Sequence, residues 1–426
     1  MEIINYNEKH DEIIIKRAQN DVNNVIENIK EILKTVKENG DLALSEYSEK
    51  FDGVKLKDFK VSKDEIKKSY NNIDKKLLKA IKKSITNIEE FHRLQLPKGW
   101  SKEINKGVTT GIIVRPIENV GCYVPGGRAS YPSTVLMTVI PAKIAGVERV
   151  ICCSPPDAEG KISDAVLVTA DLAGADEIYK IGGAQAIGAM AYGTETMKKV
   201  DKIVGPGNIF VTGAKKIVYG DVDIEFEAGP SEILILADET ANTEYISYDI
   251  ISQAEHDPNA SCYLVTDNEN LAISVKEKVN EISKKAKRKD IINQSLNKYS
   301  RIVITNSLDE SINLSNRYAP EHLIIMTKDD DEVLKRINNA GSIFLGQYSP
   351  VAAGDYGSGT NHVLPTGTGA RIYSGLSTES FLKKPTVQKI NQKGLKELSE
   401  FIVPIANYEG LYAHADSVKV RLDKKE

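Results

Sequence analysis

Residues 147–192 read VERVICCSPPDAEGKISDAVLVTADLAGADEIYKIGGAQAIGAMAY. The β-branched run at 147–153 predicts a strand, 163–173 a helix, 177–181 a second strand and 185–192 a second helix. Short apolar strands that alternate with helices are typical of a parallel sheet that is covered on both faces.

The same alternation continues on both sides of this segment. Before it, the residues predict a strand at 120–124 and a helix at 133–145, and after it a strand at 202–204, a helix at 210–218 and a strand at 233–236. Further helix and strand patterns follow at 245–254, 262–266, 269–287, 301–305, 308–318, 323–326, 331–340 and 342–345. We therefore predict an α/β fold with two doubly wound Rossmann-like domains.

The flanking regions have a different composition. Residues 11–95 carry apolar side chains at helical spacing and predict a helical N-terminal segment, whereas 108–116 predicts a strand that ends at a proline. The Gly-rich stretch 352–369 predicts a loop of the kind that carries function on a rigid scaffold. Beyond residue 377 we expect extended segments and short helices, a C-terminal tail that packs on a partner subunit.

Composition narrows the class of protein. The 426 residues include 56 Lys and Arg against 60 Asp and Glu, a formal charge of −4, so the chain lacks the basic surface of a nucleic-acid-binding protein. No apolar run reaches the ~18 residues of a membrane span, and the N-terminus does not resemble a signal or transit peptide, which predicts a cytoplasmic protein. The cysteines form no C-x-x-C pair and are interpreted as buried apolar side chains. They are Cys122, Cys152, Cys153 and Cys262.

Two of the histidine-containing segments lie beside predicted helices. Gln253 and His256 share one face at the end of a helix, where they could hold a metal ion, although a histidine at a helix C-terminus also opposes the helix dipole. Glu321 and His322 place two titratable groups side by side, either for general acid/base catalysis or as a solvated surface pair.

Two further segments complete a candidate metal site. Asp355 in the Gly-rich stretch can bind a cation, and His362 in the same stretch either ligates or fastens the loop. His414 lies in the tail, where a lone histidine is usually structural. Together the four segments offer two histidines, one aspartate and one glutamine, a mixed N/O set that fits a Zn²⁺ site open to substrate.

Three glycine turns each follow a predicted strand and precede a helix. They are Gly126-Gly127, Gly182-Gly183 and Gly205-Pro-Gly207. Such turns can bring backbone amides and a helix N-terminus to a phosphate, although a tight turn by itself also selects glycine. None completes the dinucleotide-binding fingerprint. Three of them in one sheet nevertheless predict a nucleotide-sized site.

With these motifs, the chain resembles the histidinol dehydrogenase family over nearly its whole length. The motifs, in their usual order, are Gly121-Cys-Tyr-Val-Pro-Gly-Gly-Arg-Ala-Ser-Tyr-Pro-Ser133, Gly182-Gly-Ala-Gln-Ala-Ile187, Gly205-Pro-Gly-Asn208, Ala228-Gly-Pro-Ser-Glu232, Gln253-Ala-Glu-His-Asp-Pro258, Ala319-Pro-Glu-His-Leu323 and Gly354-Asp-Tyr-Gly-Ser-Gly-Thr-Asn-His-Val-Leu-Pro-Thr366. The resemblance implies a homodimer that uses NAD and zinc to oxidise L-histidinol to L-histidine through the aldehyde, the last step of histidine biosynthesis.

The resemblance also implies roles for single residues. Glu321 and His322 would be the acid/base pair. The zinc ligands would be Gln253, His256, Asp355 and His414, the last reaching in from the tail of the second subunit. NAD would contact Tyr123, Gln185 and Asn208. Ser231, Glu409 and His322 would line the substrate site together with the zinc ligands. Gly357 stands where many members of the family carry Cys, and since glycine cannot ligate, that position is no zinc ligand here.

The domain arrangement implied by the resemblance is an insertion. Residues 120–231 would form an α/β domain with the nucleotide-binding turns, inserted into a domain built from 21–119 and 232–376 that carries the metal and acid/base residues. Residues 1–20 would form an N-terminal segment and 377–426 the tail.

Three alternative functions remain open. A related zinc- and NAD-dependent dehydrogenase could use the same scaffold for another polar alcohol. A zinc hydrolase could use Glu321 as the base for metal-bound water, which would leave the glycine turns unexplained. A non-catalytic nucleotide-binding or scaffold protein would leave the zinc set without a role.

Overall fold

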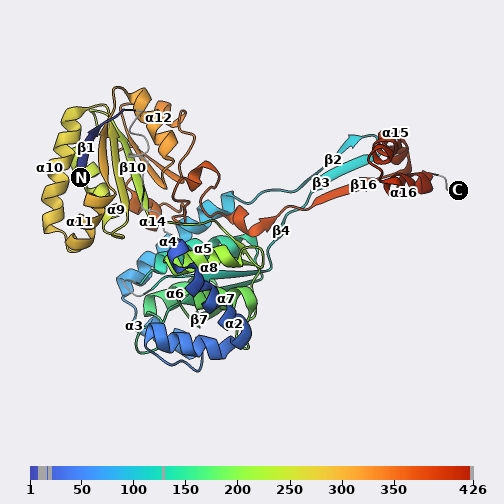
Figure 1. The fold of residues 1–426 in the computed structure, drawn as a ribbon, viewed down its shortest axis with the longest axis horizontal. Helices are drawn as coiled ribbons and strands as arrows, with labels where there is room; N and C mark the ends of the chain where they lie inside the picture. Colours follow the sequence, from blue (N-terminus) through green and yellow to red (C-terminus); the bar gives the residue numbers. More distant parts are fainter. Residues whose placement is uncertain (8–16, 18–21, 127–129, 423–426) are drawn as a thin grey trace.

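The computed structural model describes residues 1–7, 17, 22–126 and 130–422. Two parallel sheets covered by helices form the main body, and a slender arm that carries the C-terminal helices projects from it (Figure 1). The predicted α/β fold class is confirmed. Among the described helices, none is long and apolar enough to cross a membrane.

The first sheet has five parallel strands in the order β7-β6-β5-β8-β9. They are β5 (Asn119–Tyr123), β6 (Arg149–Ser154), β7 (Glu177–Lys180), β8 (Lys202–Val204) and β9 (Asp223–Ile224), joined by α5 (Pro132–Ala145), α6 (Asp164–Ala173), α7 (Gly183–Tyr192) and α8 (Ile209–Val218). The strand order reverses between β5 and β8. In open α/β sheets, ligands bind at the carboxyl ends of the strands at such a reversal.

Three helices that precede this sheet in sequence pack on it. They are α2 (Ile26–Tyr47), α3 (Lys63–Asn72) and α4 (Lys75–Leu94). Ile29 of α2 is buried in one cluster with Ile151 of β6, and Ile88 of α4 is buried on the other face in a cluster with Val120 of β5. This packing differs from the expected grouping of 21–119 with 232–376. Helical periodicity shows that a face will be buried, but it does not identify the sheet that receives it.

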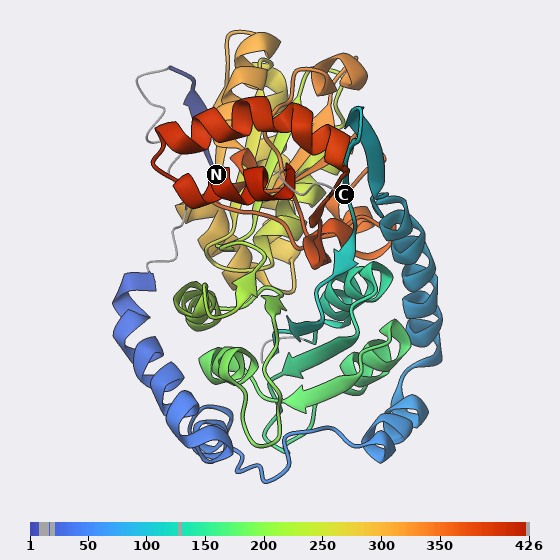
Figure 2. The same ribbon diagram turned by 90° about the vertical axis from the view of Figure 1, so that its right-hand side faces the viewer.

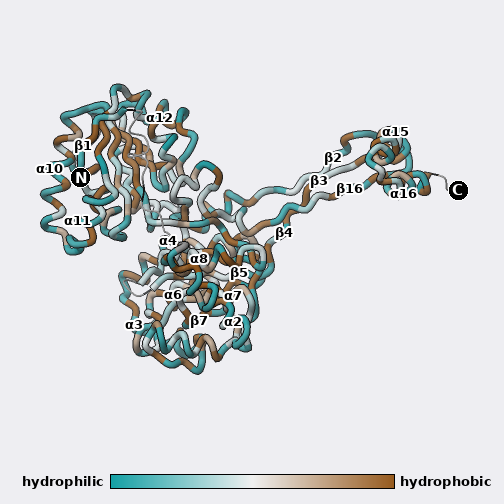
Figure 3. The backbone as a smooth tube through the Cα atoms, viewed as in Figure 1, coloured by the Kyte–Doolittle hydropathy of each residue, from teal (hydrophilic) through white to brown (hydrophobic). Residues whose placement is uncertain are grey.

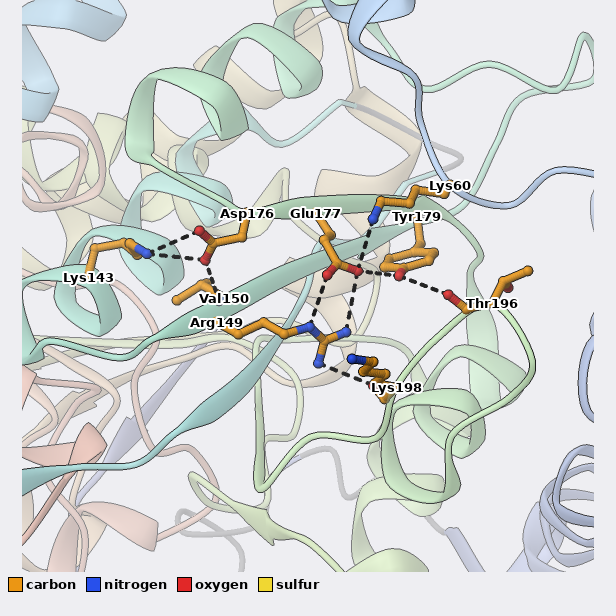
Figure 4. A network of polar contacts seen from close by, with 9 residues as sticks. All are labelled: Lys60, Lys143, Arg149, Val150, Asp176, Glu177, Tyr179, Thr196 and Lys198. Carbon is orange, nitrogen blue, oxygen red and sulfur yellow. Dashed lines mark hydrogen bonds and ion pairs between the residues drawn. The ribbon is translucent and has the colours of Figure 1, made fainter.

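Charged side chains clamp the amino ends of two strands in this sheet (Figure 4). Arg149 at the start of β6 contacts Glu177 at the start of β7, with Nε 3.0 Å from Oε1, and Lys60 approaches Glu177 Oε2 at 3.4 Å. Tyr179 donates its hydroxyl proton to the same carboxylate. The segment around Lys60 thereby joins the edge of the sheet beside β7, where a bridge pairs Lys60 with Tyr179.

The second sheet has six parallel strands in the order β1-β12-β11-β10-β13-β14. They are β1 (Glu2–Asn5), β10 (Glu232–Ala237), β11 (Ser261–Thr266), β12 (Arg301–Ile304), β13 (His322–Met326) and β14 (Ser342–Leu345). Its helices are α9 (Thr243–Ala254), α10 (Glu269–Lys285), α11 (Lys289–Lys298), α12 (Leu308–Tyr318), α13 (Asp330–Leu334) and α14 (Val351–Tyr356). Its central strands form a hydrophobic block between the helices (Figure 3). β10, β11 and β13 are buried along their whole length, as their continuous apolar sequences predict.

The arm is an antiparallel ribbon with two helices at its end (Figure 2). Its strands are β2 (Trp100–Asn105), β3 (Val108–Ile112) and β16 (Thr386–Ile390) in the order β16-β3-β2, with β4 (Arg115–Pro116) paired to β15 (Leu382–Lys383) at its base. The helices are α15 (Gln392–Tyr408) and α16 (Tyr412–Leu422). The tail is therefore partly helical, and it is held by a strand from a distant part of the chain.

One local prediction is wrong. The start of the Gly-rich stretch, expected to be a loop, forms the short helix α14, which ends just after Asp355. Gly354 within this helix lies against Phe344, since a Cβ atom there would be 2.8 Å from the phenyl ring. This glycine serves close packing rather than a turn.

Candidate active site

Glu321 and His322 lie at the amino end of β13, in the interior of the six-stranded sheet. The chain leaves α12, passes Ala319 in the left-handed conformation (φ 50°) and enters the strand, where His322 pairs with Ile233 of β10. Glu321 is 6% exposed and His322 5%. This burial excludes the solvated surface pair that the sequence left open.

The main chain of Glu232 holds both members of this pair. Its N–H donates to Glu321 Oε2 at 2.7 Å, and its carbonyl oxygen lies 3.0 Å from His322 Nδ1. Nδ1 is also 3.5 Å from Glu321 Oε2. These neighbours are acceptors, so they favour a proton on Nδ1. His322 Nε2 is buried and has no hydrogen-bond partner among the described residues, which leaves it available for proton exchange with a ligand.

Electrostatics tune this imidazole. Burial by itself lowers the pKa of His322, but the charge of Glu321 and its hydrogen bond outweigh burial and raise the pKa to about 9, with a smaller contribution from Asp355. The histidine therefore binds its proton tightly. A general base of this kind becomes active as the pH rises.

Three of the four predicted metal ligands lie in the main body. Gln253 is the penultimate residue of α9, and 2% of its surface is exposed. His256 is exposed in the turn that follows α9. Asp355 is near the end of α14, with 15% of its side chain exposed.

Phe344 connects α14 with His322, because its ring centroid is 6.1 Å from that of His322 and a Cβ atom at Gly354 would lie 2.8 Å from the same ring. Burial is the main cause that raises the pKa of Tyr356, and the charges of Asp355 and Glu255 raise it further. The charge of Asp355 also raises the pKa of His322, which agrees with its place on α14 beside Phe344.

His362 fastens Asp355 in place. Its Nδ1 lies 3.3 Å from the carbonyl oxygen of Asp355 and 3.9 Å from its carboxylate Oδ1. Burial lowers the pKa of His362, although Asp355 opposes this shift. Of the two roles left open for His362, this geometry favours the loop fastener.

Glu409 and His414 lie elsewhere, on the arm. Glu409 follows α15 and His414 is in the first turn of α16, and both are exposed. These two helices lie at the far end of the arm (Figure 1). Within the described ranges, no group of three or more His, Cys, Asp or Glu could hold a metal ion. One chain thus brings together only part of the predicted set.

The predicted cofactor residues lie at the carboxyl edge of the five-stranded sheet. Tyr123 ends β5, is 3% exposed and accepts a hydrogen bond from the N–H of Gly183 at 3.0 Å. Gln185 in α7 is 2% exposed. Asn208 is exposed and caps α8 through its amide oxygen, 3.0 Å from Phe210 N.

The glycine turns have a structural cause in addition to any ligand. Gly205 has a φ of 117°, and a Cβ atom there would lie 2.1 Å from the carbonyl oxygen of Tyr123. A Cβ at Gly207 would be 2.4 Å from Val211. The same edge nevertheless exposes helix N-termini without side-chain caps, those of α5 and α7. Gly127 lies outside the described residues.

The sequence analysis did not identify Glu232, although it predicted its neighbour Ser231 as a site residue. Ser231, predicted to contact substrate, is partly buried and precedes β10, where its carbonyl oxygen accepts from Ser261 N at 3.0 Å. Glu232 beside it holds the acid/base pair and also pairs with Arg17. The sequence pattern that could have identified Glu232 is its place at the start of the apolar run Glu232–Ala237. A carboxylate in such a buried strand is rare unless it is paired.

Comparison with known proteins supplies the family. A family model described as histidinol dehydrogenase matches residues 15–422. The chain is 57% identical to the histidinol dehydrogenase of Methanothermobacter thermautotrophicus, with 99% of each chain covered, and 48% identical to that of Clostridium acetobutylicum, with 97% and 96% covered. The chain belongs to the histidinol dehydrogenase family. A solved structure of histidinol dehydrogenase from Elizabethkingia anophelis superposes with a TM-score of 0.95 at 43% identity and covers 99% of this chain and 98% of that one.

Membership in the histidinol dehydrogenase family confirms the predicted enzyme class. The chain is an oxidoreductase of this family, with the family's place at the last step of histidine biosynthesis. This result disfavours the hydrolase and scaffold alternatives.

Proposed function

We propose that this enzyme oxidises L-histidinol to L-histidine through the aldehyde in two NAD-dependent steps, with a zinc ion that orients the substrate. The observation that carries the proposal is the buried Glu321–His322 pair with its unpartnered Nε2, in a chain of this family. The same scaffold could serve another polar alcohol, and the choice between substrates is tested below.

The acid/base pair supplies the proton transfers. When bound, NAD would accept the hydride in each step. In the first step His322 takes the hydroxyl proton at Nε2 while its Nδ1–H remains bonded to the carbonyl oxygen of Glu232. In the second, Glu321 orients and deprotonates the water that adds to the aldehyde.

The donor set fits zinc. Gln253, His256 and Asp355 from one subunit, with His414 from a second copy, form a mixed N/O set with a single carboxylate. Gln253 is 2% exposed near the end of α9, and its amide oxygen is a donor that can complete a mixed N/O set. When bound, the ion would hold the imidazole and amine of the substrate.

The carboxyl edge of the five-stranded sheet fits NAD. The N-termini of α5 and α7 lack side-chain caps there. The dipole at a helix start favours the negative charge of a pyrophosphate, although the first N–H of α7, that of Gly183, already donates to Tyr123. Tyr123, Gln185 and Asn208 lie at the same edge, where Asn208 is exposed and caps α8 with its amide oxygen. We also propose that the enzyme acts in the cytoplasm, as the sequence predicts.

The arm fits a homodimer. It exposes large apolar side chains that the described part of the chain leaves uncovered: Trp100, Ile104, Phe401, Ile405, Tyr408, Leu411, Tyr412 and Val420. Tyr408, for example, is 94% exposed. Exposed apolar clusters of this kind mark protein interfaces. A second copy that covers the arm would also bring Glu409 and His414 to a site they cannot reach in their own chain.

The first experiment measures NADH formed per L-histidinol consumed, with and without a chelator. We expect about two NADH per histidinol, because each hydride transfer reduces one NAD. The yield should fall on chelation and return with Zn²⁺. One NADH per substrate would mean that oxidation stops at the aldehyde, and faster turnover of small diols would favour the alternative substrate class.

A further inference from the structure

A buried ion pair lies directly behind the acid/base pair. Arg17 Nη1 is 2.7 Å from Glu232 Oε2, and only 4% and 3% of the two side chains are exposed. Neither of these two side chains has a role in the reaction proposed above. Because burying two charges is costly, a pair at this position needs an explanation.

Glu232 connects this pair to the chemistry through its own main chain. Its N–H holds Glu321 and its carbonyl oxygen holds His322, at 2.7 and 3.0 Å. Its side chain faces the other way and also accepts from Gly367 N at 3.0 Å. A movement of Glu232 would therefore displace both members of the acid/base pair.

Arg17 fixes Glu232 relative to the turn that precedes the pair. Its second terminal nitrogen donates to the carbonyl oxygen of Tyr318, and its guanidinium lies 3.7 Å from the centre of the Tyr318 ring. Tyr318 is the last residue of α12, three positions before Glu321. One guanidinium thus joins the start of β10 to the start of β13, the two strands that present the pair.

Charge balance requires the arginine. Burial raises the pKa of Glu232 to about 7, Arg17 opposes that shift, and the nearby charge of Glu321 adds to it. The protonated His322 compensates Glu321, but without Arg17 the buried carboxylate of Glu232 would lose the cation that pairs with it. Glu232 would then take up a proton or move, and either change alters the main-chain groups that hold Glu321 and His322.

We infer that Arg17 is a positioning residue of the active site, which acts through Glu232 on the Glu321–His322 pair. The kinetic part of this inference rests on the proposed function. Its structural part does not, because the geometry of His322 can be observed without substrate.

The kinetic test compares Arg17→Met, Arg17→Lys, Glu232→Gln and the double variant Arg17→Met/Glu232→Gln in the full-length enzyme. Arg17→Met should lower kcat for histidinol by about 10- to 100-fold, the cost of small misplacements of catalytic groups, with KM changed far less. Arg17→Lys should recover part of the loss. The double variant should be faster than Arg17→Met, because it leaves no uncompensated carboxylate.

Arg149→Met is the matched control, since Arg149 also pairs with a carboxylate but in the other sheet. It should lower stability and leave kcat at the wild-type value. Equal kcat losses in Arg17→Met and Arg149→Met, or a loss in KM alone, would overturn the inference.

The second test follows the imidazole of His322 by NMR of the ligand-free, histidine-labelled enzyme, with the signal assigned by its loss in His322→Asn. Its Nδ1 proton signal should shift or broaden in Arg17→Met and stay unchanged in Arg149→Met. An unchanged signal in Arg17→Met would also overturn the inference. If the wild-type enzyme did not oxidise histidinol, the proposed function would fail while this test still decides the role of Arg17.

Discussion

The proton on His322 sets the expected pH dependence of the reaction. Only the neutral imidazole can accept the hydroxyl proton, and the pKa of this histidine is raised to about 9, burial notwithstanding, mainly by Glu321. We therefore expect kcat/KM for histidinol to rise from neutral pH towards about pH 9. A pH profile of initial NADH formation checks this. A flat profile would show that His322 is not the base.

Glu321 should matter most in the second step. Glu321→Gln keeps the shape of the side chain but cannot deprotonate water, so oxidation of the aldehyde should slow by about 100-fold or more. Oxidation of the alcohol should slow far less, and its alkaline limb should move to lower pH because His322 loses the negative charge beside it. Separate assays with the alcohol and with the aldehyde as the starting substrate measure both steps. Equal losses in the two assays would contradict this division of roles.

At the scale of elements, the Arg149–Glu177 contact joins β6, β7 and the segment around Lys60 (Figure 4). Burial raises the pKa of Glu177, but hydrogen bonds from Arg149 and Tyr179 outweigh it and lower the pKa to about 2. The contact therefore stabilises the fold fully above the usual pKa of 4.5, and this contribution is lost as the pH falls towards about 2.

Removal of this carboxylate should destabilise the five-stranded sheet. Glu177→Gln should lower the free energy of unfolding by about 1–2 kcal/mol at neutral pH, a value reduced by the partial solvent access of the contact. Urea titrations at neutral pH and near pH 3 measure the change, which should shrink in acid. Glu159→Gln removes the exposed Lys161–Glu159 pair in the same sheet domain and should have almost no effect. Similar losses in both variants would refute the prediction.

The elements that sequence predicted well are those whose patterns have one physical cause. Continuous apolar runs such as Ser261–Thr266 mark strands that are buried on both faces, and the predicted strand at 262–266 is confirmed. β2 has no such signal, because all six of its residues are exposed and it forms by pairing with β3. The glycines around Gly354 led us to predict a loop. Composition does not show that this glycine is needed because Phe344 packs against it.

For the whole molecule, the limit of sequence reasoning is the relation between distant parts. The Glu321–His322 pair could be identified because the two residues are adjacent in the sequence. The contact between Glu232 and Arg17 could not, because 215 positions separate these residues. His414 is harder still, since in one chain it lies on the arm, away from Gln253 and His256 (Figure 1). Its assignment to the metal site came from family resemblance and was not visible in any spacing.

Coexpression of two inactive variants tests this relation directly. His414→Ala removes the proposed ligand on the arm, and Asp355→Asn removes a proposed ligand in the main body, so the proposed homodimer of each variant should be inactive. If His414 serves the site of the other subunit, a mixed dimer contains one site with both changes and one with neither. With random pairing in a two-fold dimer, about a quarter of wild-type activity should return. If His414 served its own chain, every site would lack a ligand and none would return. The control coexpresses His414→Ala with His256→Ala, which should restore a similar fraction because His256 also lies in the main body.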